Sequence, residues 1–179
     1  SLLPARRLAR GFVEQRDAAE ASYLLRAGNI QGAVRVAEAS VADGYIAAAS
    51  VVAPVLESGV VAPARARRVL DPIMRRMDDD APPPLRAVLA GVCAAERDVR
   101  CARLQATRAA AAGVRSVAPV LAWLRDNAPD DEQREDARAW LDALRRQPPP
   151  AARGAAPSPS LPEPLAEPTT TTRPPPVAP

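Results

Sequence analysis

The pentapeptide VAPVL stands at Val52–Leu56 and again at Val117–Leu121, 65 positions later. The same offset aligns further residues of the two parts, Val34, Arg35 and Ala37 with Val99, Arg100 and Ala102. Further along, the offset becomes 71, because Leu70-Asp71 matches Leu141-Asp142. The constant order of these matches indicates that the chain contains two similar halves.

The sequence around both pentapeptides is typical of short helices separated by turns. Apolar residues recur three and four positions apart, and glycine, which is favoured just after a helix, stands at Gly28, Gly44, Gly59 and Gly113. These patterns predict helices at residues 4–27, 30–42, 45–57, 63–77, 85–95, 98–112, 116–126 and 131–146. Pro72 is expected to kink or split the fourth of them.

The fold class that follows is all-α: a short array of helical hairpins, similar to an α-solenoid, with about seven or eight helices. We expect one helical-repeat domain at residues 1–147, whose halves, residues 4–77 and 85–147, are joined by a linker at residues 78–84. Residues 148–179 hold 12 of the 21 prolines and few large apolar side chains. Such a composition predicts a disordered tail.

Two segments carry a family resemblance: LLRAGNIQGAVRVAEAS, Leu24–Ser40, and LAGVCAAERDVRCARLQATRAAAAG, Leu89–Gly113. Both resemble tetratricopeptide repeats, in which a turn is followed by a hydrophobe, an alanine three residues on, and small residues at each later turn. In the second segment Arg97 stands where the family has glycine. The other helix pairs look as much like HEAT repeats.

The resemblance implies a non-catalytic role. Arrays of such repeats bind peptides or partner proteins on a concave face, so we expect a scaffold or protein-interaction module. The alternative is a structural or accessory segment of a larger multidomain protein, tethered by the proline-rich tail. A contiguous exposed groove would favour the interaction module, and a flat apolar face at one end of the array would favour the accessory segment.

Composition argues against other function classes. The chain has no histidine, and all 24 basic residues are arginine, so His-based acid–base chemistry and lysine Schiff bases are excluded. We predict no enzyme, no cofactor and no metal site. The formal charge is only +3 with the acidic residues interspersed, which makes nucleic-acid binding unlikely. No apolar run is long enough for a membrane span, and the first residues lack the pattern of a signal peptide.

The candidate partner-binding residues are arginines. Arg35 and Arg100 occupy matching positions at the offset of 65. Arg65 and Arg68 belong to a basic cluster on the fourth predicted helix and could bind an acidic partner. The alternative for this cluster is a solvated face whose alkyl stems cover apolar neighbours.

Cys93 and Cys101 are the only cysteines. Eight residues of continuous helix span about 12 Å, whereas a disulfide needs Cα atoms within about 7 Å. A bridge therefore requires a turn between them, which the predicted hairpin puts at residues 96–98. We favour a pair of small buried side chains in a helix–helix seam, with the disulfide as the alternative. No further thiol or imidazole is present to complete a zinc site.

Overall fold

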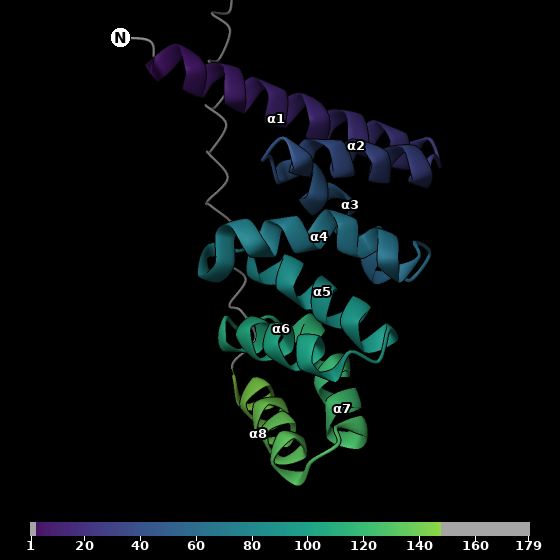
Figure 1. Cartoon of the computed structure of the whole chain (residues 1–179), viewed down its shortest axis with the longest axis vertical. Helices are drawn as coiled ribbons and strands as arrows, with labels where there is room; N and C mark the ends of the chain where they lie inside the picture. The colour runs from purple at the N-terminus through teal and green to yellow at the C-terminus, as the bar shows by residue number, and fades with distance from the viewer. Residues whose placement is uncertain (1–2, 148–179) are drawn as a thin grey trace, which may run out of the picture. The chain divides into compact units, whose positions relative to one another are not determined.

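The computed structural model describes residues 3–147, with side chains from Arg10 onward (Figure 1). These residues form eight α-helices and two 3₁₀ turns, with no strand among them. The helices are α1 (Leu3–Arg26), α2 (Ile30–Ala42), α3 (Ala47–Glu57), α4 (Pro63–Met77), α5 (Pro83–Ala95), α6 (Val99–Ala111), α7 (Ala118–Asn127) and α8 (Asp131–Arg146). The predicted all-α fold is confirmed. The predicted disordered tail, residues 148–179, lies outside the described residues.

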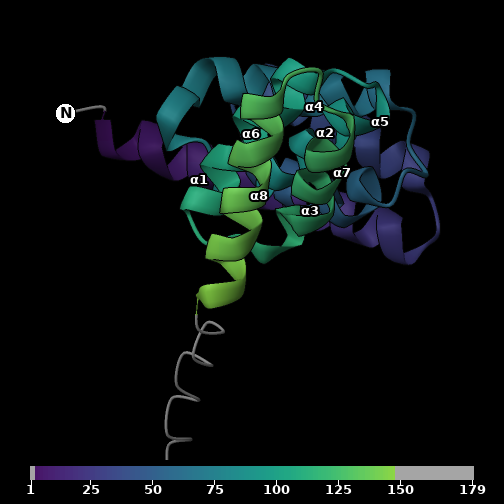
Figure 2. The same cartoon turned by 90° about the horizontal axis from the view of Figure 1, so that it is seen from below.

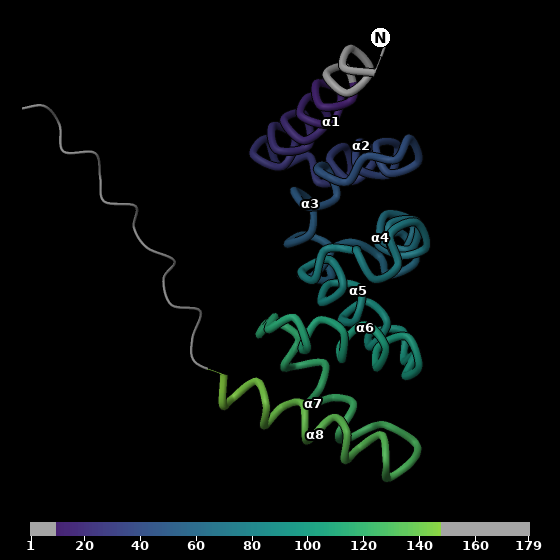
Figure 3. Tube along the Cα trace, turned by 90° about the vertical axis from the view of Figure 1, so that its left-hand side faces the viewer, coloured from purple at the N-terminus to yellow at the C-terminus, as the bar shows by residue number. Residues whose placement is uncertain are grey.

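The helices of residues 3–147 follow one another from α1 to α8 along a two-layered stack (Figures 1 and 3). The odd-numbered helices form one layer, in which α1 packs on α3, α3 on α5, and α5 on α7. In the other layer α2 packs on α4 and α6 on α8. At the end of the stack α7 and α8 lie side by side (Figure 2). Packing between successive pairs is the arrangement of a helical-hairpin array.

Two hairpin turns in this stack are built alike. Gly28 before α2 and Arg97 before α6 both have positive φ, +75° and +59°. The next residue caps the helix: Asn29 Oδ1 accepts from the Gly32 amide at 2.9 Å, and Asp98 Oδ1 accepts from the Cys101 amide at 3.0 Å. Each cap satisfies a backbone donor that the first helical turn leaves free.

These caps correct the predicted register of α2 against α6. Asn29 and Asp98 are 69 positions apart, not 65, so Arg35 is structurally equivalent to Leu104 and not to Arg100. Four residues are close to one helical turn. An alignment at offset 65 therefore still matches buried positions with buried positions. It is displaced by one helical turn from the alignment at offset 69.

Pro72 lies inside α4, which continues from Pro63 to Met77, so the helix is not split there. One further expectation needs correction. The predicted linker at residues 78–84 is shorter, since Asp78–Asp80 form a 3₁₀ turn and Pro83 already begins α5. Proline fits there because the first residues of a helix have no intrahelical partner for their amides.

Arginines join the two halves of the stack. Arg67 of α4 reaches Glu96 and Asp98 before α6, each at 2.7 Å. From α6, Arg108 pairs with Asp78 and Asp79 just after α4, at 3.0 and 3.2 Å. Between these bridges Arg86 of α5 is only 3% exposed.

Candidate functional site

A groove of about 580 Å³ lies on the layer of even-numbered helices, between α6 and the start of α8. Its lining residues are Val99, Arg100, Arg103, Leu104, Thr107, Pro129 and Gln133. The five from α6 recur at spacings that put them on one helix face. Asp130 fixes the opposite wall, because its carboxylate caps α8 by accepting from the Gln133 amide at 2.8 Å.

The groove combines apolar surface with positive charge. Leu104 is 47% exposed, an unusual state for a large aliphatic side chain in this stack. Arg103 is paired with Asp136 of α8 at 2.9 Å, whereas Arg100 is exposed and forms no ion pair within the described residues. Gln133 Oε1 is buried without a hydrogen-bond partner among them. The groove thus offers an exposed cation, Arg100, and an apolar contact, Leu104.

Of the predicted partner-binding arginines, only Arg100 lines the groove. Arg100 lines the groove, while Arg35 is exposed on α2 and does not line it. Arg65 and Arg68 both face Glu38 of α2, at 3.2 and 3.7 Å. Their charge is thereby partly neutralised within the stack.

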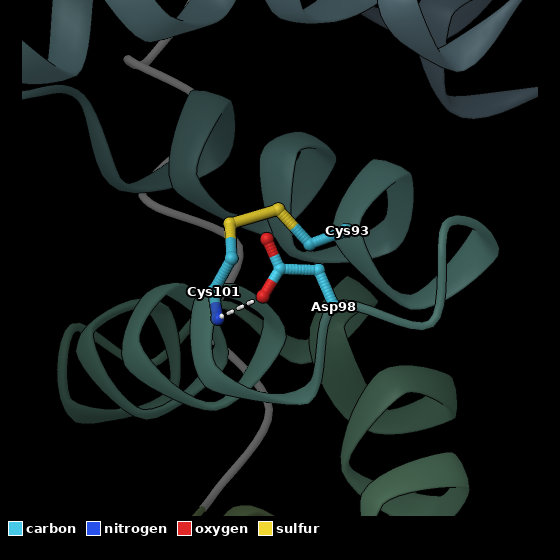
Figure 4. Close-up of side chains that lie close together, drawn as sticks. All are labelled: Cys93, Asp98 and Cys101. Atoms are coloured by element: carbon cyan, nitrogen blue, oxygen red, sulfur yellow. Dashed lines mark hydrogen bonds between the residues drawn. A yellow bond between two sulfur atoms is a disulfide. The ribbon is translucent and has the colours of Figure 1, made fainter.

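Beside the groove, Cys93 of α5 and Cys101 of α6 are joined in a disulfide with Cα atoms 5.8 Å apart (Figure 4). The turn between α5 and α6 brings them within reach, as the hairpin geometry required. Asp98 lies between the two cysteines, and its carboxylate and both sulfurs are within 4.8 Å of one another. Arg67 Nη2 lies 2.7 Å from Asp98 Oδ2 and 3.1 Å from Cys93 Sγ.

The environment of Asp98 stabilises its ionised form. The hydrogen bond from the Cys101 amide lowers the pKa of the Asp98 carboxyl, and the hydrogen bond from Arg67 lowers it further. A depressed pKa in the folded state contributes stability above the unfolded value, near 3.9, and this contribution is lost as pH falls through the folded value.

We therefore expect Asp98→Asn to remove part of the acid sensitivity of the fold. Asparagine keeps an oxygen for the cap but carries no charge for Arg67. The difference in unfolding free energy between wild type and variant should be largest near neutral pH and shrink below about pH 4. Because Asp98 is 39% exposed, we expect a difference of at most about 1 kcal/mol. Urea titrations at several pH values measure it, and a pH-independent difference would contradict the assignment.

The chain matches no family model, and no curated protein or solved structure shows significant similarity to it. The helical stack is compatible with a helical-repeat fold, but none of these comparisons supports the resemblance to tetratricopeptide or HEAT repeats. Of the helices that the structure describes, none has an apolar stretch long enough to cross a membrane.

Several residues of these sites were not predicted from the sequence. The sequence does not predict Leu104 or Gln133 as site residues. The exposure of Leu104 and the missing partner of the Gln133 amide oxygen follow from how α6 and α8 pack. Arg67 lies in the same basic segment of the fourth predicted helix as Arg65 and Arg68 and was not singled out. The sequence does indicate that Arg67 faces a different direction from Arg65, because side chains two positions apart on a helix point about 200° away from each other.

Proposed function

We propose that this protein is a non-catalytic interaction module that binds a short acidic and apolar segment of a partner protein in the α6–α8 groove. The observation that carries the proposal is Arg100, an exposed guanidinium beside Leu104 in a groove whose lining contains no acidic residue. Charge complementarity calls for a carboxylate, and the exposed leucine for an aliphatic or aromatic neighbour.

The groove favours a peptide over a small carboxylic acid. A peptide offers a carboxylate for Arg100 and an apolar group for Leu104 together, whereas a small acid offers the carboxylate alone.

The test is selection of displayed random peptides on the full-length protein, followed by calorimetric titration of the enriched peptides. We expect enriched sequences to carry Asp or Glu next to a large apolar residue. Arg100→Glu should weaken their binding by about tenfold or more, because it replaces attraction with repulsion. Arg35→Glu is the matched control, as Arg35 is also exposed but lies outside the groove, and it should leave the affinity unchanged.

Two outcomes would contradict this function: enrichment without any acidic residue, or equal affinity in wild type and Arg100→Glu.

The second candidate, an accessory segment of a larger protein, is favoured by Phe12 and Tyr23 of α1, which are 71% and 65% exposed. They are eleven positions apart and share one helix face. Binding that survives Arg100→Glu but is lost in Tyr23→Ser would place the contact there.

A further inference from the structure

The disulfide between α5 and α6 has a polar surrounding that packing alone does not explain. Arg67 comes from a different hairpin, on α4, and places Nη2 3.1 Å from Cys93 Sγ. Two acids hold this guanidinium in position: Asp98 at 2.7 Å from Nη2 and Glu96 at 2.7 Å from Nε. A cation is thus fixed against one sulfur of the bridge.

The two sulfurs are not equivalent. Cys93 is 0% exposed in the core, whereas Cys101 is half-buried in the first turn of α6. An incoming thiol reaches the more exposed residue more readily. In thiol–disulfide exchange the attacked sulfur becomes bonded to the incoming one, and the other leaves as a thiolate. Arg67 stands where that leaving charge develops, since a neighbouring cation favours a thiolate.

We propose that Cys101 is a site of thiol–disulfide exchange with a small thiol such as glutathione, and that Cys93 is the leaving thiolate stabilised by Arg67. The external thiolate forms a bond to Cys101 Sγ while the Cys93–Cys101 bond breaks and its electron pair stays on Cys93 Sγ. A second external thiolate then attacks the mixed disulfide and releases Cys101 as a thiolate. The two small thiols leave as their own disulfide, so two electrons pass from them to the protein.

Metal binding fits the same residues less well. Cys93, Asp98 and Cys101 offer only three ligand atoms within 4.8 Å of one another, whereas a structural zinc site has four. The Asp98 carboxylate is already paired with the Arg67 guanidinium at 2.7 Å, so a metal ion would have to displace Arg67 to use it. The proposal does not depend on peptide binding in the groove.

The experiment incubates the native full-length protein with millimolar reduced glutathione, quenches with iodoacetamide and maps adducts by mass spectrometry. We expect the glutathione adduct on Cys101. Each single variant, Cys93→Ser or Cys101→Ser, keeps one cysteine. The Cys101 that remains in Cys93→Ser should react with glutathione disulfide at least about tenfold faster than the Cys93 that remains in Cys101→Ser. An adduct on Cys93, or a bridge that glutathione reduces only after the protein is unfolded, would overturn the proposal.

A separate experiment tests the role of Arg67. Arg67→Gln should slow reduction by about tenfold, and Arg67→Lys, which keeps the charge, by less than about threefold. Arg68→Gln is the matched control: it removes a charge from the same helix but one that faces Glu38. Circular dichroism verifies that each variant is folded. Reduction of folded Arg67→Gln at the wild-type rate would overturn the assignment of Arg67.

Discussion

Replacing Leu121 with alanine is expected to lower the free energy of unfolding by about 3 kcal/mol. Leu121 ends the second VAPVL pentapeptide and is 0% exposed. It belongs to α7, which packs on α5, α6 and α8, so the deleted methyl groups leave a cavity that no single helix can close. Urea unfolding followed by circular dichroism measures the loss.

The first pentapeptide provides the companion experiment. Leu56 is 2% exposed on α3, so Leu56→Ala should be destabilising by a similar amount if both copies serve the core. Val60→Ala is the surface control, because Val60 is 62% exposed, and should change stability by no more than about 0.5 kcal/mol. A loss below about 1 kcal/mol at Leu121 would show that the repeated pentapeptide does not mark the core.

Much of the fold was predictable because it depends on local chemistry. Gly28, Gly44, Gly59 and Gly113 all have positive φ in the structure, a conformation that glycine adopts without strain. The predicted helix ends therefore fall close to the observed ones. Glycine does not mark every such turn, because Arg97 has φ +59° at the turn before α6, where no glycine is present.

Apolar matches alone did not fix the alignment of the halves. Shifting a helix by four residues keeps its apolar face buried, so alanine and valine matches support offsets of 65 and 69 equally well. The caps of Asn29 and Asp98 distinguish the two. So do the positive-φ turns, because Gly28 and Arg97, like Gly44 and Gly113, are 69 positions apart; the glycine pair was visible in the sequence. The pairing of Arg35 with Arg100 depended on the wrong offset, although Arg100 itself lines the groove.

Charge pairing was the other feature hidden in the sequence. Arg65 and Arg68 are three residues apart and share a face, which turns toward Glu38 of α2. Arg67 points away from that face and reaches Glu96 and Asp98 across the joint between the halves. Helical geometry separates Arg67 from its neighbours, but its partners lie about thirty residues away and become known only once α4 and α5 are packed.

The largest effect is expected at Arg86, the buried arginine of that joint. Its Nη1 donates to Gln105 Oε1 at 3.1 Å and its Nε donates to the Ala81 carbonyl at 3.3 Å, while Nη2 donates to the Asp78 carbonyl. Burial lowers the pKa of the guanidinium, and Arg108 lowers it further, but an arginine remains charged at neutral pH. Arg86→Ala removes all three bonds and leaves a cavity, so we expect a loss of about 4 kcal/mol in unfolding free energy.

A double-mutant cycle separates the charge from the packing. Gln105→Leu leaves the guanidinium buried with one acceptor fewer and should be destabilising by about 2–3 kcal/mol. Arg86→Met fills most of the space but deprives Gln105, which is 7% exposed, of its donor. Combining the two replaces the pair with apolar side chains of similar volume, and such replacements of buried polar pairs are often nearly neutral. The double variant should therefore be more stable than either single variant. If the losses simply add, the Ala81 and Asp78 carbonyls, and not Gln105, are the partners that make Arg86 necessary.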